Sequence, residues 1–267
     1  MLTQVTLYND LRNNVRFFVE KLSLGTTLNK IGRKLALSLT DILTLGLFKQ
    51  TAQITTKKKL WVVMEPKCSY KTLVVSLNRF APLALQILCL ILQHNRSACH
   101  VVKHIDSTDI PVCTNRKASR HQTMRLLADW GKTGKGWFYG LKLHLIADLD
   151  GRLLAIKCTS VNADDRSVVL DLAKGINGIF VGDAGYLSES LGKEFYREYG
   201  RILLTKTRSN MKKLATMLDV WLYSTRMRIE LNFRNLKCFF GLLTSLPRSV
   251  SGYLANYTYS ILAYLWG

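Results

Sequence analysis

The sequence has few acidic residues and no long apolar run. Only 18 Asp and Glu stand against 38 Lys and Arg in 267 residues, which gives a formal net charge of +20. Such a surplus attracts polyanions whatever their sequence, so we expect nucleic acid as the standing partner. The longest apolar run, Leu83 to Leu92, falls short of the ~20 residues that a membrane-spanning helix needs. We therefore expect a buried helix there and no membrane partner.

Two further absences narrow the class of protein. The six cysteines are scattered, with no CxxC pair and no Cys/His cluster at zinc spacing, which favours reduced thiols. The N-terminal segment contains acid and amide residues where a signal peptide needs an uninterrupted apolar core. We expect a cytoplasmic protein. Because 48% of the residues are hydrophobic, the chain can bury a core and is not a disordered basic tail.

The first part of the chain, residues 1–97, has a helical and basic pattern. Thr40-Asp41 fits the start of one helix, and Ser69 can cap an apolar-periodic stretch over 70–93 that bends or restarts at Pro82. Helices joined by basic loops are typical of DNA readers, and equally of a plain helical cap. We predict a DNA-binding region over 1–97.

From residue 98 onward, strand-like stretches alternate with helical ones. Strands are expected over 101–105, 137–148, 152–159, 178–181 and 201–206, with a hairpin turn between the second and the third. Helices are expected over 165–175, between the last two strands, and over about 211–240. This order predicts an α/β fold, a mixed sheet with flanking helices, in a second domain over 98–267.

Two aspartates follow predicted strands. Asp106 comes after VVKHI and Asp183 after IFVG, and Gly182 and Gly185 allow tight turns around the second aspartate. In open α/β sheets, functional groups collect where strands end. A lone aspartate at such a place is also an ordinary turn or N-cap residue, so the position alone leaves both readings open.

The predicted helix over 211–240 carries a third acid. Tyr223, Arg226, Glu230 and Lys237 fall within an arc of roughly 60° at ~100° per residue, and Arg234 lies near it. The adjacent stripe is apolar and should face the core; it consists of Leu218, Leu222, Ile229, Phe233, Leu236 and Phe240. One carboxylate among cations and a phenol fits a catalytic site, and equally a solvated surface with an Arg226–Glu230 ion pair.

These residues resemble a known signature. Tyr223-x2-Arg226-x3-Glu230-x6-Lys237 is similar to the Y-x2-R-x3-E-x6-K signature of bacterial transposases of the insertion-sequence 4 superfamily. Further segments, in the family's order, most resemble the DDE transposases of the insertion-sequence 982 family: HIDSTDIPVC, GWFYGLKLHLIADLDG, VNADDRSVV, FVGDAGYLS and LLTKTRSNMK. The resemblance runs from about residue 100 to the end of the chain.

The resemblance implies a ribonuclease H-like fold in which Asp106, Asp183 and Glu230 are the catalytic triad and hold two Mg²⁺ ions, with Mn²⁺ as a substitute. It implies DNA cleavage at the ends of an insertion sequence, strand transfer into target DNA, and a homodimer acting on paired terminal inverted repeats. The chemistry is consistent, because carboxylates hold hard divalent cations that neutralise a scissile phosphate and activate an attacking oxygen. Tyr223, Arg226 and Lys237 would contact phosphates near the scissile bond.

Several neighbouring residues are secondary candidates. Asp109, where the family tends to have a proline, is an alternative ligand to Asp106. Asp165 resembles a recurrent family aspartate, although capping the following helix is the simpler role. His144 fits a core or network histidine. Further DNA contacts, each of which could also be a solvated surface residue, are expected at Arg234, Lys142, Arg120 and Trp137.

Two other functions stay open at this point. A ribonuclease H-like nuclease without strand transfer would share the triad but would not need specific element ends. A catalytically decayed, DNA-binding relative of a transposase would keep the basic surface, although the intact triad speaks against decay. In each case we expect a bacterial cytoplasmic protein that associates with the nucleoid when it is bound to DNA.

Overall fold

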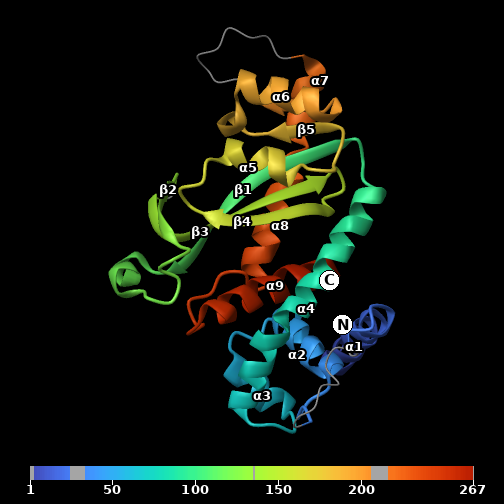
Figure 1. The fold of residues 1–267 in the computed structure, drawn as a ribbon, viewed down its shortest axis with the longest axis vertical. Helices are drawn as coiled ribbons and strands as arrows, with labels where there is room; N and C mark the ends of the chain where they lie inside the picture. The colour runs from blue at the N-terminus through green and yellow to red at the C-terminus, as the bar shows by residue number, and fades with distance from the viewer. Residues whose placement is uncertain (1–2, 25–33, 135, 206–215, 267) are drawn as a thin grey trace. The chain divides into compact units, whose positions relative to one another are not determined.

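The computed structural model describes residues 3–24, 34–134, 136–205 and 216–266 (Figure 1). The chain forms two compact units, Met1–Ile91 with Asn235–Gly267, and Leu92–Arg234. The predicted boundary after residue 97 divides a DNA-binding region from a catalytic domain, whereas these units are defined by contacts. The functional boundary stays a prediction. Residues 206–215 lie outside the described residues; they include parts of the expected strand at 201–206, of the expected helix at 211–240 and of the LLTKTRSNMK segment.

The first unit is helical, as the sequence predicts. Its elements are α1 (Gln4–Lys21), α2 (Leu39–Thr51), α3 (Lys57–Met64), most of α4 (Tyr70–Ser97), the end of α8 (Met227–Cys238) and α9 (Val250–Trp266). The almost wholly buried α2 packs on α1 and on α9. Gln50 of α2 donates to Asn256 Oδ1 of α9 at 2.9 Å. The C-terminal segment therefore belongs to the N-terminal helical unit, which local sequence patterns did not indicate.

Side-chain caps set the beginnings of these helices. Ser38 Oγ accepts a hydrogen bond from the backbone N–H of Asp41 at 3.1 Å, so α2 begins before the expected start at Thr40-Asp41. Ser69 caps α4 as expected, because its Oγ accepts from the N–H of Thr72 at 3.1 Å. Helix α4 then continues through Pro82 over 28 residues.

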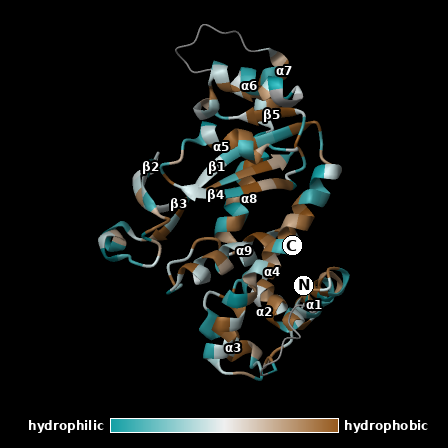
Figure 2. Ribbon diagram, viewed as in Figure 1, coloured by the Kyte–Doolittle hydropathy of each residue, from teal (hydrophilic) through white to brown (hydrophobic). Residues whose placement is uncertain are grey.

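Helix α4 is also the one helix in the described part of the chain that is long and apolar enough to cross a membrane. Its most apolar 18-residue window has a mean hydropathy of 1.7, and 39% of that window is buried. Figure 2 shows hydrophobic and hydrophilic residues alternating along this helix. A single helix of this kind is weak evidence for a membrane, since the core helix of a soluble protein has the same length and composition.

The second unit contains a six-stranded mixed sheet, as the sequence predicts. Its strands are β1 (Val102–Cys113), β2 (Asp129–Thr133), β3 (Gly136–Asp148), β4 (Leu153–Ser160), β5 (Ile179–Gly182) and β6 (Ile202–Thr205). The order is β2-β3-β1-β5-β6, and β4 also pairs with β3. Strand β3 is antiparallel to β1, β2 and β4, whereas β5 is parallel to β1 and β6. The crossovers that parallel pairing requires carry helices α5 (Asp165–Leu172) and α6 (Glu189–Tyr199).

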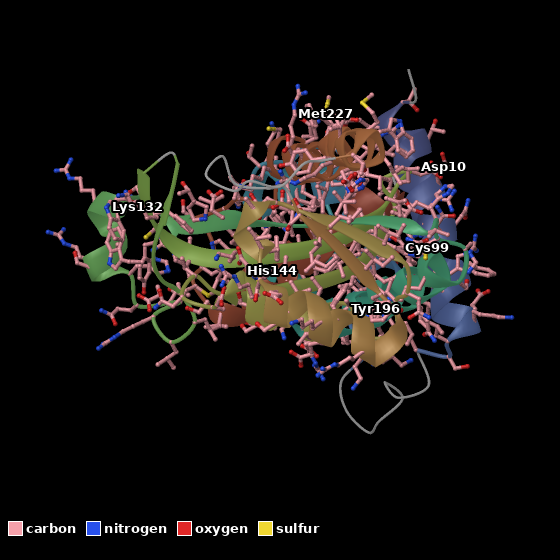
Figure 3. The ribbon with its side chains drawn as sticks, turned by 90° about the horizontal axis from the view of Figure 1, so that it is seen from above. Asp10, Cys99, Lys132, His144, Tyr196 and Met227 are labelled. Atoms are coloured by element: carbon pink, nitrogen blue, oxygen red, sulfur yellow. The ribbon has the colours of Figure 1, made fainter. Side chains whose placement is uncertain are left out.

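Helices lie on both faces of this sheet. Val168, Val169 and Leu172 of α5 and Phe195 of α6 form one core cluster with strand residues such as Ile105. The other face of β1 contacts the turn between α7 (Met217–Ser224) and α8. In Figure 3, Met227 of α8 and Tyr196 of α6 lie on opposite sides of the strands. We therefore distinguish an α5 face and an α8 face of the sheet.

Two predicted elements differ from the structure. Strand β1 does not end at residue 105 but continues to Cys113, because β3 pairs with it over that whole length. The expected helix over 211–240 is two helices, α7 and α8. Arg226 N–H bonds to Tyr223 O and Arg228 N–H to Thr225 O, both at 3.2 Å, so a tighter three-residue turn replaces the α-helical pattern.

The break changes part of the predicted core stripe. Leu222, Ile229, Phe233 and Leu236 are buried as expected, whereas Leu218 on α7 is exposed. Strand β2, which the sequence did not predict, pairs with the first half of β3.

Candidate active site

Asp106 and Asp183 lie side by side where β5 ends. The parallel pairing of β1 with β5 stops at His104↔Val181, and each aspartate is the second residue after that pair. Side chains alternate along strands, and neighbouring strands are ~4.8 Å apart, so both carboxylates emerge together on one face. The expectation that Asp106 follows the end of its own strand is wrong: it lies within β1, where the neighbouring strand ends.

Backbone N–H groups hold each of these carboxylates. Ser107 N–H donates to Asp106 Oδ1, and Gly185 N–H donates to Asp183 Oδ1, both at 2.8 Å. Asp183 is the N-cap of the short 3-10 helix η3 (Ala184–Tyr186). A Cβ atom on Gly185 would lie 2.9 Å from Asp183 Oδ1, so a side chain at this position would displace the carboxylate from its place.

Arg226 connects the aspartates to the third predicted acid. Its Nη2 lies 2.5 Å from Asp106 Oδ2 and its Nη1 lies 3.8 Å from Glu230 Oε1. Nη1 also donates to the Tyr223 hydroxyl at 3.2 Å. Glu230 itself is 60% exposed, whereas Arg226 and Asp106 are largely buried. The guanidinium of Arg226 thus brings together three of the four signature residues, namely Arg226 itself, Tyr223 and Glu230.

The electrostatics follow from burial. Burial raises the pKa of Asp106 to about 6, although Arg226 opposes the rise; the charge of Asp183 adds to it. Burial alone would lower the pKa of Arg226, but the charge of Asp106 and hydrogen bonds to Asp106 and Tyr223 raise it above its usual value. The guanidinium therefore stays charged, and its charge offsets only part of the effect that burial has on the Asp106 carboxylate.

A hydrogen bond from β1 holds the turn that carries Arg226. The Thr225 hydroxyl donates to Leu222 O at 2.7 Å and lies 2.9 Å from His104 Nε2. One hydroxyl group therefore connects the Leu222 carbonyl with the imidazole of His104. Burial lowers the pKa of His104, which favours the neutral ring. Sequence reasoning missed His104 and Thr225, although His104 precedes Asp106 on the same face of β1.

A second polar group lies on the α5 face. Asp165 accepts from Lys142 Nζ at 3.0 Å and from Ser107 Oγ at 3.2 Å, and His144 Nδ1 lies 3.8 Å away. The cap of α5 is Asp164, which accepts from Arg166 N–H, so the expected capping role of Asp165 is wrong. His144 is buried and lies 2.9 Å from Thr159 Oγ1, which agrees with a network histidine.

Asp109 also belongs to the α5 face. It pairs with Lys142 across the strands, as Ser107 pairs with His144. Because side chains alternate along β1, Asp109 points to the opposite face from Asp106. Only Asp106 therefore faces Arg226 and Glu230.

The other predicted DNA contacts are spread over the surface. Arg234 and Arg120 are exposed, Lys142 is engaged by Asp165, and Lys237 lies on the part of α8 that belongs to the first unit. Trp137 on β3 is exposed, and Lys132 Nζ lies 5.9 Å from its ring centroid. Along β3, Trp137 is roughly 26 Å from Leu145, the cross-strand partner of Asp106, at ~3.3 Å per residue. Figure 3 shows Lys132 at the far end of this hairpin from His144.

The donor chemistry of the three acids fits a hard divalent cation, since carboxylate oxygens are the ligands that Mg²⁺ and Mn²⁺ prefer. Among the described residues, a different group has its donor atoms within 4.8 Å of one another: His100, Asp148 and Asp150. Asp148 and Asp150 lie at the β3–β4 turn, His100 lies just before β1, and the three residues are held by contacts within the protein. Asp150 pairs with His100 and Arg152, and Asp148 Oδ1 accepts from two backbone N–H groups of the turn.

Comparison with known proteins identifies the family. The family model described as Transposase DDE domain matches residues 96–249, more than half of the chain. A cryo-EM structure of the piggyBac transposase, in a synaptic complex with hairpin DNA, has a similar fold. The TM-score is 0.57 at 10% identity, over 94% of this chain and 70% of that one. No curated protein matches the sequence. The mixed sheet is thus the predicted ribonuclease H-like one, and the chain belongs to the family of DDE transposases.

Proposed function

We propose that this transposase cuts DNA at the ends of its own insertion sequence and joins them to target DNA, with Asp106, Asp183 and Glu230 as its catalytic acids. The observation that carries the proposal is the register that sets Asp106 beside Asp183, with Arg226 reaching from Asp106 to Glu230. In this scheme water attacks the phosphodiester at the element end, and the freed 3′-hydroxyl then attacks the target strand. No protein nucleophile is required.

The three acids would hold divalent cations, Mg²⁺ or in its place Mn²⁺, and two of them in the full site. When bound, such a pair neutralises the scissile phosphate and activates the attacking oxygen. The partly compensated charge of Asp106 supports this assignment, because a buried carboxylate with a raised pKa gains most from an added cation. Arg226 and the cation would compete for Asp106, and a displaced guanidinium would be available to bind a DNA phosphate.

Asp106 rather than Asp109 is the proposed ligand on β1. The alternation of side chains directs Asp109 toward Lys142 and away from Arg226. Asp109→Asn is therefore the matched control for Asp106→Asn, on the same strand and with the same chemical change.

The finer assignments concern partners. We infer that Tyr223, Arg226, Glu230 and Lys237 form the signature of the insertion-sequence 982 and 4 groups, and that terminal inverted repeats and target DNA are the substrates. Away from the cut, Arg234, Lys142 and Arg120 would contact DNA phosphates, and Trp137 would stack on a base. A homodimer on paired ends, without a membrane partner and in the bacterial cytoplasm, completes the proposal.

The test uses the purified full chain, Mg²⁺ or Mn²⁺, and DNA that carries the element's ends. We expect Asp106→Asn, Asp183→Asn and Glu230→Gln to lose cleavage and joining by a factor of at least ~10³ while they still bind DNA, and Asp109→Asn to keep both activities. Parental activity in folded Asp183→Asn and Glu230→Gln would refute the site. Cleavage without joining by the parent protein would favour the nuclease alternative instead.

A further inference from the structure

The first turn of α5 is hydrogen-bonded to the residue that holds Asp106. Asp165 Oδ2 accepts from the Ser107 hydroxyl at 3.2 Å. The backbone N–H of the same Ser107 donates to Asp106 Oδ1 at 2.8 Å. The side chains of Ser107 and Asp106 point to opposite faces of β1, so Asp165 acts on the backbone of the strand and does not approach the Asp106 carboxylate itself.

The next residue of α5 is hydrogen-bonded to the residue that holds Asp183. Arg166 Nε donates to Gly185 O at 3.1 Å. The N–H of Gly185 donates to Asp183 Oδ1 at 2.8 Å. Two consecutive residues of one helix therefore hold the two backbone segments that orient the adjacent aspartates.

Helix α5 is well placed to serve as a fixed reference. Its buried residues Val168, Val169 and Leu172 belong to the core cluster of the sheet. Its first turn is capped by Asp164, and Lys142 of β3 forms an ion pair with Asp165 Oδ1 at 3.0 Å. A carboxylate in the first turn of a helix is also favoured by the helix dipole.

We propose that Asp165 and Arg166 are positioning residues that set the separation of Asp106 and Asp183 for cation binding; this inference rests on the proposed function of those two acids. A shared cation site tolerates displacements of only ~0.5 Å in its ligands. Residues that orient ligands typically change metal affinity by a factor of 10 to 100 when they are lost. Asp165 thus acts from the opposite face of the sheet without touching the cations.

The variants separate this role from a general loss of structure. Asp165→Ala removes the acceptor for Ser107, and Arg166→Ala removes the donor to Gly185. Asp165→Asn keeps an oxygen acceptor and should lose less. Asp171→Ala is the matched control, because Asp171 lies on the same helix, is exposed, and pairs with Lys157 away from the aspartates.

The measurement is Mn²⁺ binding to the full chain without DNA, by calorimetry, with circular dichroism to verify folding. We expect the Mn²⁺ Kd to rise about 10- to 100-fold in Asp165→Ala and Arg166→Ala, less in Asp165→Asn, and not in Asp171→Ala. Cleavage by the two alanine variants should recover at high Mn²⁺ concentration, whereas cleavage by Asp183→Asn should not.

The outcomes distinguish the inference from the function on which it rests. Parental Mn²⁺ affinity in folded Asp165→Ala and Arg166→Ala, with weak binding by Asp183→Asn, would overturn the positioning role and leave the site intact. Parental affinity in Asp183→Asn would overturn the site itself. If Asp165→Ala does not fold, Ser107→Ala decides: it removes a single hydroxyl, and an unchanged Kd there would also contradict the positioning role.

Discussion

Arg226 is the residue through which the acidic side chains of the site are held together. One guanidinium lies against Asp106 and within ion-pair distance of Glu230, while Asp183 lies next to Asp106. Burial raises the pKa of Asp106 to about 6, because the charge of Arg226 opposes the effect of burial only in part and the charge of Asp183 adds to it. The site therefore has a residual negative charge that suits divalent cations.

On the opposite face, His144 makes the stability of the unit dependent on pH. Burial lowers its pKa to about 4, so the folded state keeps the ring neutral at pH values where the unfolded chain, with a pKa near 6.5, becomes protonated. The unfolded state then binds more protons, and stability falls as the pH drops from about 6.5 toward 4. We expect this residue to cost about 2 kcal/mol at pH 5 relative to pH 7.5, measured by urea unfolding.

The comparison needs a second histidine, one on the surface of the protein. His94 is exposed on α4 and serves as that control. His144→Gln should lose less stability than the parent between pH 7.5 and 5, whereas His94→Gln should lose as much as the parent. An equal pH-dependent loss in His144→Gln and the parent would show that His144 is not the responsible group.

At the scale of elements, local patterns were sufficient where hydrogen bonding is local. Strands β3 and β4 with their turn follow from alternation and turn residues. The full length of β1 does not, because its second half is stabilised by pairing with β3. The break between α7 and α8 also escaped prediction, since the contact at Thr225 comes from His104, which is distant in sequence.

The same break between α7 and α8 explains why the sequence allowed the signature residues to be identified but did not predict their arrangement in space. The predicted single helix would put Tyr223, Arg226 and Glu230 on one continuous stripe. In the structure Arg226 lies in the turn, and this position lets its guanidinium reach Asp106 on β1. Spacing alone identifies the residues, whereas the long-range contact determines what they touch.

Thr225→Val tests this turn. The substitution preserves the shape of the side chain but removes the hydroxyl that bonds Leu222 O and His104, so a buried imidazole nitrogen loses its partner. We expect a loss of about 1–3 kcal/mol in the free energy of unfolding and weaker cleavage, because Arg226 loses its position. Ser224→Ala, which removes an exposed hydroxyl bonded to Trp221 O, should change stability by less than ~0.5 kcal/mol. Similar losses in the two variants would argue against an anchoring role of the turn.

At the scale of the whole molecule, the helical unit combines two segments that are distant in sequence, and the chain as a whole carries a large positive charge. The hydrogen bond between Gln50 of α2 and Asn256 of α9 joins these two segments. The chain has 38 Lys and Arg but only 18 Asp and Glu, so most of the cations cannot form ion pairs within the protein. Asp41, Asp165 and Asp171 are each paired with one cation already. The excess of positive charge suits the proposed DNA contacts, one of which is Trp137 on the β2–β3 hairpin.

Salt dependence can separate the two kinds of DNA contact expected near that hairpin, from Trp137 on β3 and from Arg120 at the end of the 3-10 helix η2 (Asn115–Arg120). A cation that neutralises one phosphate contributes ~0.9 to the slope of log K against log salt, whereas an aromatic ring that stacks on a base contributes affinity but no slope. We expect Arg120→Ala to reduce the slope for element-end DNA by about 0.9, and Trp137→Ala to weaken binding by about 1–3 kcal/mol at an unchanged slope. Fluorescence anisotropy between low and moderate salt measures both quantities. Arg197→Ala, which removes an exposed cation from α6, is the control for Arg120 and should leave the slope at its parental value. If Arg120→Ala and Arg197→Ala gave the same slope, the charge of Arg120 on η2 would act only as part of the general positive charge of the protein, and a specific DNA contact by Arg120 would be refuted.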